Sequence, residues 1–507
     1  MALTRPSSLM FAVSVTALLS ACAVSPIPLT AEELAVSASD NMSRVAADQE
    51  PVTKSIDLYE AIARALKYNL DHHVAAVETA LRVSELDLSH YNLLPNAVAN
   101  SGYAARDKYD ASSSLNLVTG VENFGASTSQ EKKFSTDDIT FSWSILDFGL
   151  SYVRAHQAAD KVLIAEETRR KAAHRIVEDV RTAYWRAVSA ERLTGKLKAL
   201  ESRTVAALSN SRAIASGEET SPIAALTYQR ELIEIKRTLQ ELQRDLSVAK
   251  AQLAALMNLT PGTHFSIAIP TGRQTAPALT MAADVMLDQA LQNRSELREN
   301  AYQKRINSQE ARAALLELLP GLQLYAGSNF DSNDFLLNSN WLSWGTKASW
   351  NLIKVFSYPA KTTVIEGQDH LLDERALALT MAIMTQVHIS RVRYVNYQKE
   401  LSTAADYADV QQSLVQNIRV EAASDRVSEQ TLIREELNTL VSQARQDIAY
   451  ANCQNAYANV FASIGLDPYY GPSDMTLSVD QLAANLKQLW FERGDYPAGA
   501  KLASAEH

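Results

Sequence analysis

Few residues of this chain are spaced for catalysis or for metal binding. His72 and His73 are adjacent, and neighbouring helix positions face different ways, so they cannot converge on one ion. His370 and Glu374 are separated by one helical turn, which favours an exposed helix face over a metal site. We expect Cys453 to fill space in a helical core. With no nucleophile elbow and no glycine-rich phosphate loop, the sequence predicts a protein that is not an enzyme and uses no metal or cofactor.

Cys22 has a more specific interpretation. Residues 1–21 carry a positive charge near their start, Arg5. An apolar stretch follows, and the segment ends in Leu19-Ser20-Ala21, which predicts a signal peptide. Together with Cys22 this string is similar to a bacterial lipobox, in which the cysteine becomes the acylated first residue of the mature protein. Ala23 follows where an aspartate would signal retention in the inner membrane, so we predict a lipid anchor at Cys22 in the outer membrane. The alternative is an ordinary signal peptide with a chance cysteine.

Composition predicts a folded chain with long helices. Of its 507 residues 47% are hydrophobic and 21% are charged. Glycine and proline number 16 and 14, about half of their usual share of ~12% together, so there are few breakers of secondary structure. The net charge of −10 argues against a nucleic-acid partner, which would bind to a basic face.

The chain contains an internal repeat. Leu94-Pro95 aligns with Leu319-Pro320, and farther along the chain Trp143 aligns with Trp350 after a shorter insert in the second copy. These alignments define the following segments: signal peptide 1–21, lipidated extension 22–54, first copy 55–262, linker 263–282, second copy 283–469 and tail 470–507.

Each copy is predicted to contain helix, strand, loop, strand and helix. Apolar and polar residues alternate with a period of two over about 96–105 and 138–146 in the first copy, and over about 321–330 and 344–352 in the second. The first copy carries a longer, serine-rich insert between its strands, at 112–135, which we expect to be a loop.

The last part of each copy is a long helical hairpin. Residues 150–215 contain no proline and a single glycine, and at 1.5 Å per residue they would form a rod of about 100 Å. The breaks at 217–222 and 423–429 are the predicted hairpin tips. After the first tip, apolar residues fill eight of eight heptad positions, which predicts a coiled coil. These positions are Leu232, Ile235, Leu239, Leu242, Leu246, Ala249, Leu253 and Leu256.

Four strands that are apolar on one face suit a transmembrane β-barrel, but four cannot close one. We therefore expect three copies to contribute twelve strands. The predicted lipid-facing residues are Phe141, Trp143, Leu322, Leu324, Trp344 and Trp350. The helical rods carry charged stretches such as 169–171 and 241–245, so they must stand in water.

These features together resemble the TolC-like outer membrane efflux proteins. The resemblance rests on the duplicated Ala-Leu helices, the Leu-Leu-Pro before each first strand, the tryptophan in each second strand, Ile145-Leu146-Asp147-Phe148-Gly149, and Ser216-Gly217 followed by a heptad helix. It implies a mainly α protein with a small β part. It also implies a homotrimer with a twelve-stranded barrel in the outer membrane lipids and an α-helical coiled-coil tunnel in the periplasm. The partners it implies are a periplasmic adaptor protein and an inner-membrane pump.

The same resemblance assigns roles to the tips. The adaptor would dock at Gly217, Glu218, Glu219, Pro222, Ser424, Asp425 and Arg426. The periplasmic entrance would be lined by Arg426, Glu429 and Gln430. The family's acidic entrance positions fall on Gln430 and Ile433 here, and the second tip lacks the usual glycine.

The function expected from sequence is therefore a passive conduit across periplasm and outer membrane. Its cargo would be small molecules such as drugs or toxic compounds, driven by the pump through the adaptor. Two alternatives remain: the outer membrane component of a type I protein secretion system, and a structural coiled-coil lipoprotein that spans the periplasm.

Overall fold

The structure is a computed structural model that describes residues 26–45, 47, 49–215, 222–270, 275–424, 426–469, 471 and 476–494. The chain divides into two compact units, residues 1–51 and 52–507. In the first unit, helix α2 (Ala31–Arg44) begins with a capping box, in which Thr30 accepts a bond from the Glu33 amide at 3.2 Å and the Glu33 carboxylate accepts one from the Thr30 amide. The predicted anchor Cys22 lies outside the described residues.

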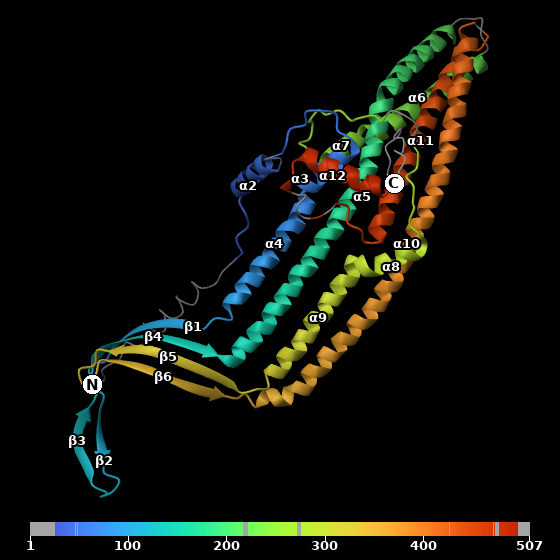
Figure 1. Cartoon of the computed structure of the whole chain (residues 1–507). Coiled ribbons are helices and arrows are strands. Elements are labelled where there is room, and N and C mark those ends of the chain that lie inside the picture. The colour runs from blue at the N-terminus through green and yellow to red at the C-terminus, as the bar shows by residue number, and fades with distance from the viewer. Residues whose placement is uncertain are drawn as a thin grey trace, which may run out of the picture. The chain divides into compact units, whose positions relative to one another are not determined.

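The second unit contains the remaining helices and strands (Figure 1). In chain order they are α3 (Leu58–Tyr68), α4 (Leu70–Tyr91), β1 (Asn96–Ala105), β2 (Ala111–Leu115), β3 (Glu122–Thr128), β4 (Lys133–Ser144), α5 (Ile145–Ala215), α6 (Pro222–Ser247), α7 (Ala249–Leu256), α8 (Ala283–Asn293), α9 (Ser295–Leu316), β5 (Gly321–Asp331), β6 (Asn340–Ser349), α10 (Ile353–Ala422), α11 (Glu429–Ser463) and α12 (Val479–Glu492).

The element bounds confirm the predicted duplication. When Pro95 is aligned with Pro320, both ends of α8 and α9 coincide with those of α3 and α4. When Trp143 is aligned with Trp350, the start of α11 coincides with the start of α6, and its end coincides with the end of α7. Asn69 ends α3 and also caps α4, accepting bonds from the amides of Asp71 and His72. That cap splits the single helical stretch expected before the first strand.

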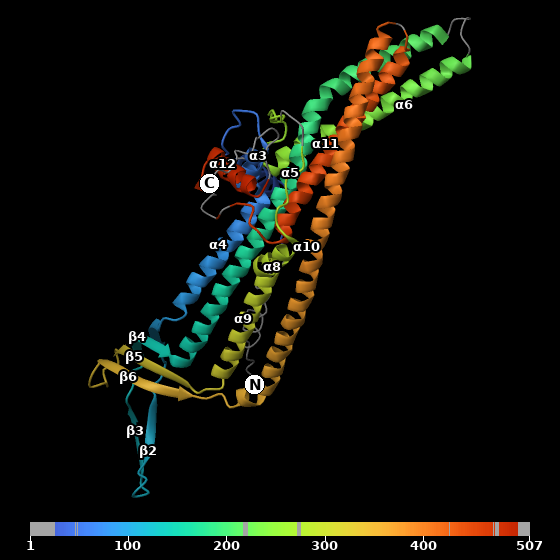
Figure 2. The same ribbon diagram turned by 45° about the vertical axis from the view of Figure 1, so that its right-hand side comes forward.

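The sheet and the adjoining helices share one order. The strands run β1-β4-β5-β6, and every neighbouring pair is antiparallel. Helix α4 leads into β1, β4 into α5, α9 into β5 and β6 into α10. Both views show these four helices side by side in the order of their strands (Figures 1 and 2). The sheet therefore has two open edges, β1 and β6, which continue as the edge helices α4 and α10.

Several sequence-based boundaries are wrong. The strand predicted at 138–146 is Lys133–Ser144, and Ile145 already begins α5, where the Asp147 amide donates to Ser144 Oγ at 3.2 Å. The strand predicted at 344–352 is Asn340–Ser349. It ends there because Ser349 pairs with Gly321, and the preceding Pro320 has no N–H to extend the ladder. Trp350 therefore lies beyond the strand.

The serine-rich insert is also not a loop. It forms an antiparallel hairpin, β2–β3, which makes a sheet of its own. In both views the hairpin extends away from the four-stranded sheet (Figures 1 and 2).

The two long helices, α5 with 71 residues and α10 with 70, pair with the helices that follow them. Leu232, Leu239 and Leu253 of the predicted heptad rows are fully buried. Among the described residues, no helix is both long and apolar enough to cross a membrane. In the second hairpin, Ile448 of α11 is 45% exposed and is not packed inside the hairpin.

A broad core surrounds the middle of the helices. Helix α3 is almost wholly buried, and Ile56 before it forms a parallel bridge with Ile267 of the predicted linker. Helix α12, within the predicted tail, packs Trp490 against Phe461 and Tyr457 of α11. The guanidinium of Arg181 lies 4.0 Å from the centre of the Trp490 ring. Cys453 is buried, as expected for a residue that fills a helical core.

Candidate functional site

The four-stranded sheet places five of the six predicted lipid-facing residues on one face. Phe141 pairs with Ala326, Trp143 with Leu324, and Trp344 with Ala326 from the other side. Leu322 lies two residues before Leu324 and shares its face. Because directly paired residues point to the same side of a sheet, these side chains form one continuous apolar surface. The opposite face carries Asn100, Ser142, Thr140 and Gln323.

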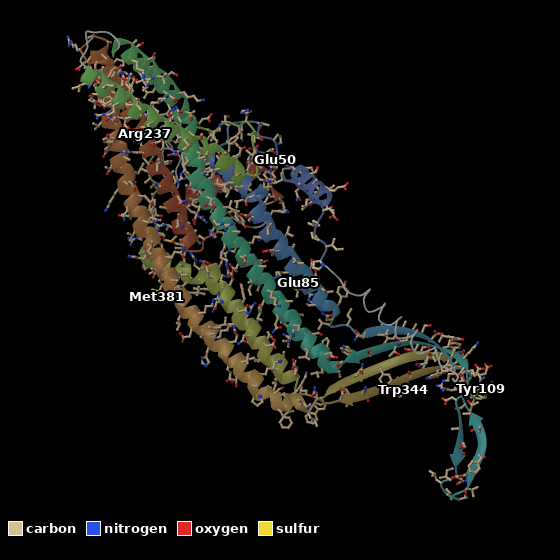
Figure 3. All side chains as sticks on the ribbon, turned by 180° about the vertical axis from the view of Figure 1, so that it is seen from behind. Glu50, Glu85, Tyr109, Arg237, Trp344 and Met381 are labelled. Atoms are coloured by element: carbon tan, nitrogen blue, oxygen red, sulfur yellow. The ribbon has the colours of Figure 1, made fainter. Side chains whose placement is uncertain are left out.

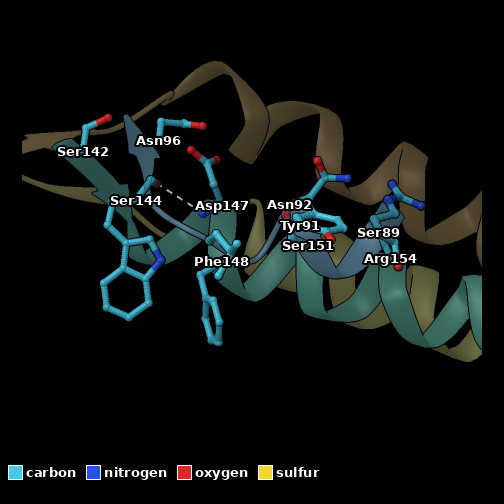
Figure 4. A pocket seen from close by; sticks show the side chains of 12 residues that line it. Ser89, Tyr91, Asn92, Asn96, Ser142, Ser144, Asp147, Phe148, Ser151 and Arg154 are labelled. Atoms are coloured by element: carbon cyan, nitrogen blue, oxygen red, sulfur yellow. Dashed lines mark hydrogen bonds between the residues drawn. The ribbon is translucent and has the colours of Figure 1, made fainter. Parts of the chain in front are cut away.

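The junction between sheet and helices separates polar from aromatic groups. A pocket of about 310 Å³ lies there, lined by Asn96, Ser142, Asp147 and Arg154 among others. Phe148 points away from the side on which Asp147 and Asn96 lie (Figure 4). Its ring meets Trp143 edge to face, with the ring centres 5.4 Å apart. Aromatic side chains thus gather where the apolar face of the sheet ends.

The edge helix α4 exposes an apolar stripe with the three- and four-residue spacing of a heptad. The stripe consists of Leu70, Val74, Val77, Leu81, Leu88 and Tyr91. Helix α10, at the other edge, exposes a second stripe, and Figure 3 shows the position of Met381 within it. That stripe consists of Ile353, Phe356, Val364, Leu371, Met381, Ile389 and Val392. We call these two surfaces the α4 stripe and the α10 stripe.

The end of α5, the start of α6 and the second hairpin tip lie at the end of the helices farthest from the sheet (Figure 2). Of the predicted docking residues, Gly217, Glu218, Glu219 and Asp425 lie outside the described residues, as does the side chain of Pro222. Ser424 and Arg426 are both exposed, and their amides donate to the Glu421 carbonyl at 3.1 Å. Ser428 caps α11, accepting a bond from the Thr431 amide. The second tip is thus a closed turn that holds Arg426 in solvent.

One predicted entrance residue, Gln430, contacts the other hairpin. Gln430 donates a hydrogen bond to Glu231 of α6. Burial, together with the nearby Glu429 carboxylate, raises the pKa of Tyr228, one turn earlier on α6. Sequence reasoning missed Tyr228 and Glu231. Their spacing of about one turn on one helix face is a weak signal that could have found them.

The first and second hairpins meet along α5 and α11 in a seam of polar and charged pairs. Glu436 accepts bonds from Arg203 of α5 and from Arg419 of α10, the latter at 3.1 Å. Farther from the tips, Asp447 pairs with Arg192, and Gln454 accepts from Arg181 at 2.8 Å. We call the contacts between α5 and α11 the inter-hairpin seam. They contrast with the leucine-rich seam inside the first hairpin.

The spacing of the three arginines was a readable signal. Arg181, Arg192 and Arg203 follow one another at equal intervals of about three helical turns, so they lie on one face of α5. Their partners on α11 could not be identified without the fold.

A cluster of charged side chains connects α5 with the residues that follow the C-terminal end of α11. Arg170 bonds Asp467 at 2.7 Å and Glu167 at 2.6 Å. Burial lowers the pKa of the nearby His174 to about 4, because the opposing effect of Asp467 is outweighed by burial and by neighbouring arginines. Arg170 is therefore not on a solvated outer face as the charge pattern suggested, whereas the Lys171 side chain is 40% exposed and pairs with Glu299 of α9. Arg244 and Asp245 of α6 are exposed, as expected.

The structure also shows where the candidate metal residues lie. His72 is buried and His73 is exposed, so the two face different directions. His370 and Glu374 are both exposed on α10. Among the described residues, no three histidine, cysteine, aspartate or glutamate side chains lie close enough together to hold an ion.

Solved structures with the same arrangement are outer membrane channels. The CmeC outer membrane channel of Campylobacter jejuni superposes with a TM-score of 0.61, covering 89% of this chain and 96% of that chain at 12% identity. The chain has the fold of the TolC-like outer membrane channels. The resemblance and the fold class predicted from sequence are thereby confirmed at the level of the fold.

Two further channels share this fold. The open state of the MtrE outer membrane channel of Neisseria gonorrhoeae has a TM-score of 0.60, covering 81% of this chain and 89% of that one at 14% identity. CusC, studied for folding and transmembrane channel formation, also scores 0.60, covering 83% and 96% at 15% identity. No protein-family profile and no curated protein matches this chain in sequence.

Proposed function

We propose that this chain is the outer membrane channel of a tripartite export system. Three copies form a passive conduit across the periplasm and the outer membrane for small molecules such as drugs or toxic compounds. An inner-membrane pump drives the export through a periplasmic adaptor protein. The chain is lipid-anchored at Cys22 and performs no chemistry of its own.

The observation that carries this proposal is the sheet with two open edges. In a bilayer, unpaired backbone groups at β1 and β6 would each cost several kcal/mol, so the sheet must close. Four strands are too few, since the smallest barrels have about eight. Because β1 runs toward the loop end of the sheet and β6 runs back from it, β1 of one copy can pair with β6 of the next in the same antiparallel manner.

The edge helices support the same closure. Helix α4 leads directly into β1, and α10 directly follows β6. Pairing β1 of one copy with β6 of the next therefore brings the α4 stripe of the first copy beside the α10 stripe of the second. Burying an exposed Leu or Val side chain contributes about 1.5–3 kcal/mol. The two stripes contain thirteen apolar residues, and the interface that they form would suit a permanent homotrimer.

Helix length supports a conduit through water rather than lipid. At 1.5 Å per residue, the 71 residues of α5 extend about 107 Å, whereas the hydrocarbon core of a bilayer is about 30 Å thick. The apolar face of the four-stranded sheet fits the bilayer, and the charged helices fit the periplasm. Trp143 and Phe148 then lie at the periplasmic surface of the outer membrane, where aromatic side chains are favoured.

The tips are the proposed contact with the adaptor. In a trimer, six of them surround one entrance, at the end that a partner from the inner membrane can reach. Arg426 and the acidic residues Glu218, Glu219 and Asp425 offer a charge pattern that such a partner can recognise. Gln430, which donates to Glu231, holds the second hairpin against α6 of the first beside this entrance.

Two other functions remain as alternatives. An outer membrane component of a type I protein secretion system would use the same trimer, and only the cargo distinguishes it. A structural coiled-coil lipoprotein needs no amphipathic sheet, and this chain has four strands with one apolar face. The sheet therefore favours a channel.

An export assay tests the proposal. The full-length protein and the variants Gly217→Trp and Arg426→Glu are expressed with their adaptor and pump, and drug accumulation in cells is measured. Both variants are expected to abolish export while the yield of trimer in the outer membrane stays unchanged. Arg391→Glu, an equal charge reversal at an exposed site in the middle of α10, is the matched control. Full export by the double variant would show that the tips are only turns.

A further inference from the structure

The polar face of the four-stranded sheet carries one tryptophan, at the start of β6. Trp341 pairs with Asn329 of β5, and Asn329 pairs on its other side with Asp138 of β4. Because directly paired residues share a face, all three lie on the face opposite Phe141. Trp344, three residues farther along β6, lies on the apolar face instead. Trp341 is 44% exposed, so its ring is accessible from the polar side.

Membrane anchoring does not explain Trp341. The aromatic girdles of membrane barrels consist of residues that face the lipid. Trp341 shares its face with the Asp138 carboxylate, and a face that carries an unpaired charge is costly to turn toward hydrocarbon. A second role is therefore needed for this indole.

Asp138 is held in a fixed position on the same face. Its Oδ2 accepts hydrogen bonds from Asn100 Nδ2 at 3.1 Å and from Thr140 Oγ1 at 3.0 Å. Asn100 is also its direct neighbour on β1. In the described part of the chain, no lysine or arginine forms an ion pair with Asp138. Its negative charge is thus left for a cation from outside the chain.

The polar face is acidic around Trp341 and basic only far from it. By the alternation of the strands, its charged residues are Asp138, Asp331 and Lys347. Asp331 lies in the next row toward the loop end of the sheet. Lys347 pairs with Gln323 near the helices, six residues from Trp341, which is about 20 Å along the strand. Since charges are screened over about 8 Å at physiological ionic strength, Lys347 does not offset the carboxylates near Trp341.

The spacing leaves room for one flat molecule to reach both groups. Neighbouring strands are about 4.8 Å apart, so the backbones at Trp341 and Asp138, two strands apart, are separated by about 10 Å. The next row toward the helices consists of the small residues Thr140, Gly327 and Ser343. A planar ligand can therefore lie over Asn329 without meeting a large side chain from that row.

We propose that Trp341, Asn329 and Asp138 form a binding site for planar aromatic cations on the inner wall of the barrel. The site rests on the proposed conduit, in which the polar face of the sheet lines the lumen, and it assigns a chemical class to the cargo. The aromatic ring stacks on the indole, whose face attracts cations more strongly than that of tyrosine or phenylalanine. The positive charge faces Asp138. Asn329, which donates to Ser343 Oγ at 2.9 Å, is held between the two.

Binding of ethidium, a planar aromatic cation, to the purified trimer in detergent tests the tryptophan. The fluorescence polarisation of ethidium rises when it binds a large complex, which gives Kd. Trp341→Ala should raise Kd about two- to five-fold, the loss expected for a cation–π contact at an exposed site. Trp344→Ala, on the apolar face of the same strand, is the matched control and should leave Kd unchanged.

A second matched pair tests the carboxylate. Asp138→Asn should raise Kd by up to about five-fold and should lessen the weakening of binding by added salt, because an exposed ion pair is lost. Asp137→Asn removes the same charge from the neighbouring residue, which lies on the apolar face, and should change neither quantity.

Equal Kd values for Trp341→Ala and Trp344→Ala would overturn the site, as would equal values for Asp138→Asn and Asp137→Asn. A trimer that binds no ethidium would also overturn it, while leaving the proposed conduit intact. A protein that native mass spectrometry finds only as single chains would instead contradict the conduit itself, on which the site depends.

Discussion

Replacing Arg192 by methionine should destabilise the contact between the two helical hairpins. Asp447 of α11 has a side chain that is only 3% exposed, and its charged partner is Arg192 of α5, which is 30% exposed. Burial lowers the pKa of Arg192, but an arginine stays charged at neutral pH. Arg192→Met therefore leaves a buried carboxylate without a compensating charge.

The expected cost follows from that burial. Breaking a buried ion pair from one side costs ~3–5 kcal/mol, and the partial exposure of Arg192 places this pair at the lower end, about 3 kcal/mol. Asp447→Asn keeps the shape of the side chain, and the Arg192 charge that it leaves unpaired can still be reached by water. We therefore expect a loss of about 1–2 kcal/mol in the free energy of unfolding. Asp447 Oδ2 has no hydrogen-bond partner among the described residues, so the pair is imperfect. Arg192→Met/Asp447→Leu should therefore be nearly neutral.

Urea unfolding of the purified protein, followed by far-ultraviolet circular dichroism, measures these differences. The midpoint should fall most for Arg192→Met, less for Asp447→Asn and little for the double variant, with the same slope throughout. If Arg192→Met unfolds like the unmodified protein, Asp447 is not desolvated in the seam. If the double variant is as unstable as Arg192→Met, packing and not charge explains the loss.

Three other outcomes are expected. Arg at Phe141 or Leu324 should cost about 2–4 kcal/mol and reduce assembly in the membrane, whereas Arg at Ser142 or Gln323 should assemble and alter conductance; equal defects on both faces would contradict the register. The pKa of His174 is about 4 in the folded protein against an ordinary 6.5, so the unfolded chain protonates first as pH falls. Unfolding free energy should therefore drop between pH 6.5 and about 4, by at most about 3 kcal/mol, and His174→Gln should remove this part of the pH dependence. Mass spectrometry of the mature N-terminus should find acyl chains on Cys22, and an unmodified N-terminus elsewhere would refute the anchor.

The duplication could be predicted because each copy keeps the same breakers in the same order. Leu94-Pro95 and Leu319-Pro320 mark corresponding ends of helices, and the structure places β1 and β5 directly after them. The alternation of Phe141 and Trp143 with Ser142 likewise identified which strand residues share a face. Such patterns can be recognised in the sequence because each depends on only a few neighbouring residues.

Other elements were missed although a local signal existed. Asn116 and Gly120 in the serine-rich insert are turn residues, but Ser112–Ser114 show no alternation that would indicate strands. In the tail, Ser478 and Gln481 form a capping box ahead of Leu482, Leu486 and Trp490, a recognisable start of α12. The pairs of the inter-hairpin seam had no such signal, because Arg192 and Asp447 are 255 residues apart in the sequence.

The subunit count of the protein extracted from the outer membrane tests the central claim most directly. Native mass spectrometry of the detergent-solubilised complex is expected to give the mass of three chains, since only then do twelve strands close the sheet and the α4 and α10 stripes become buried. A stable single chain that remains inserted in the membrane would contradict the account.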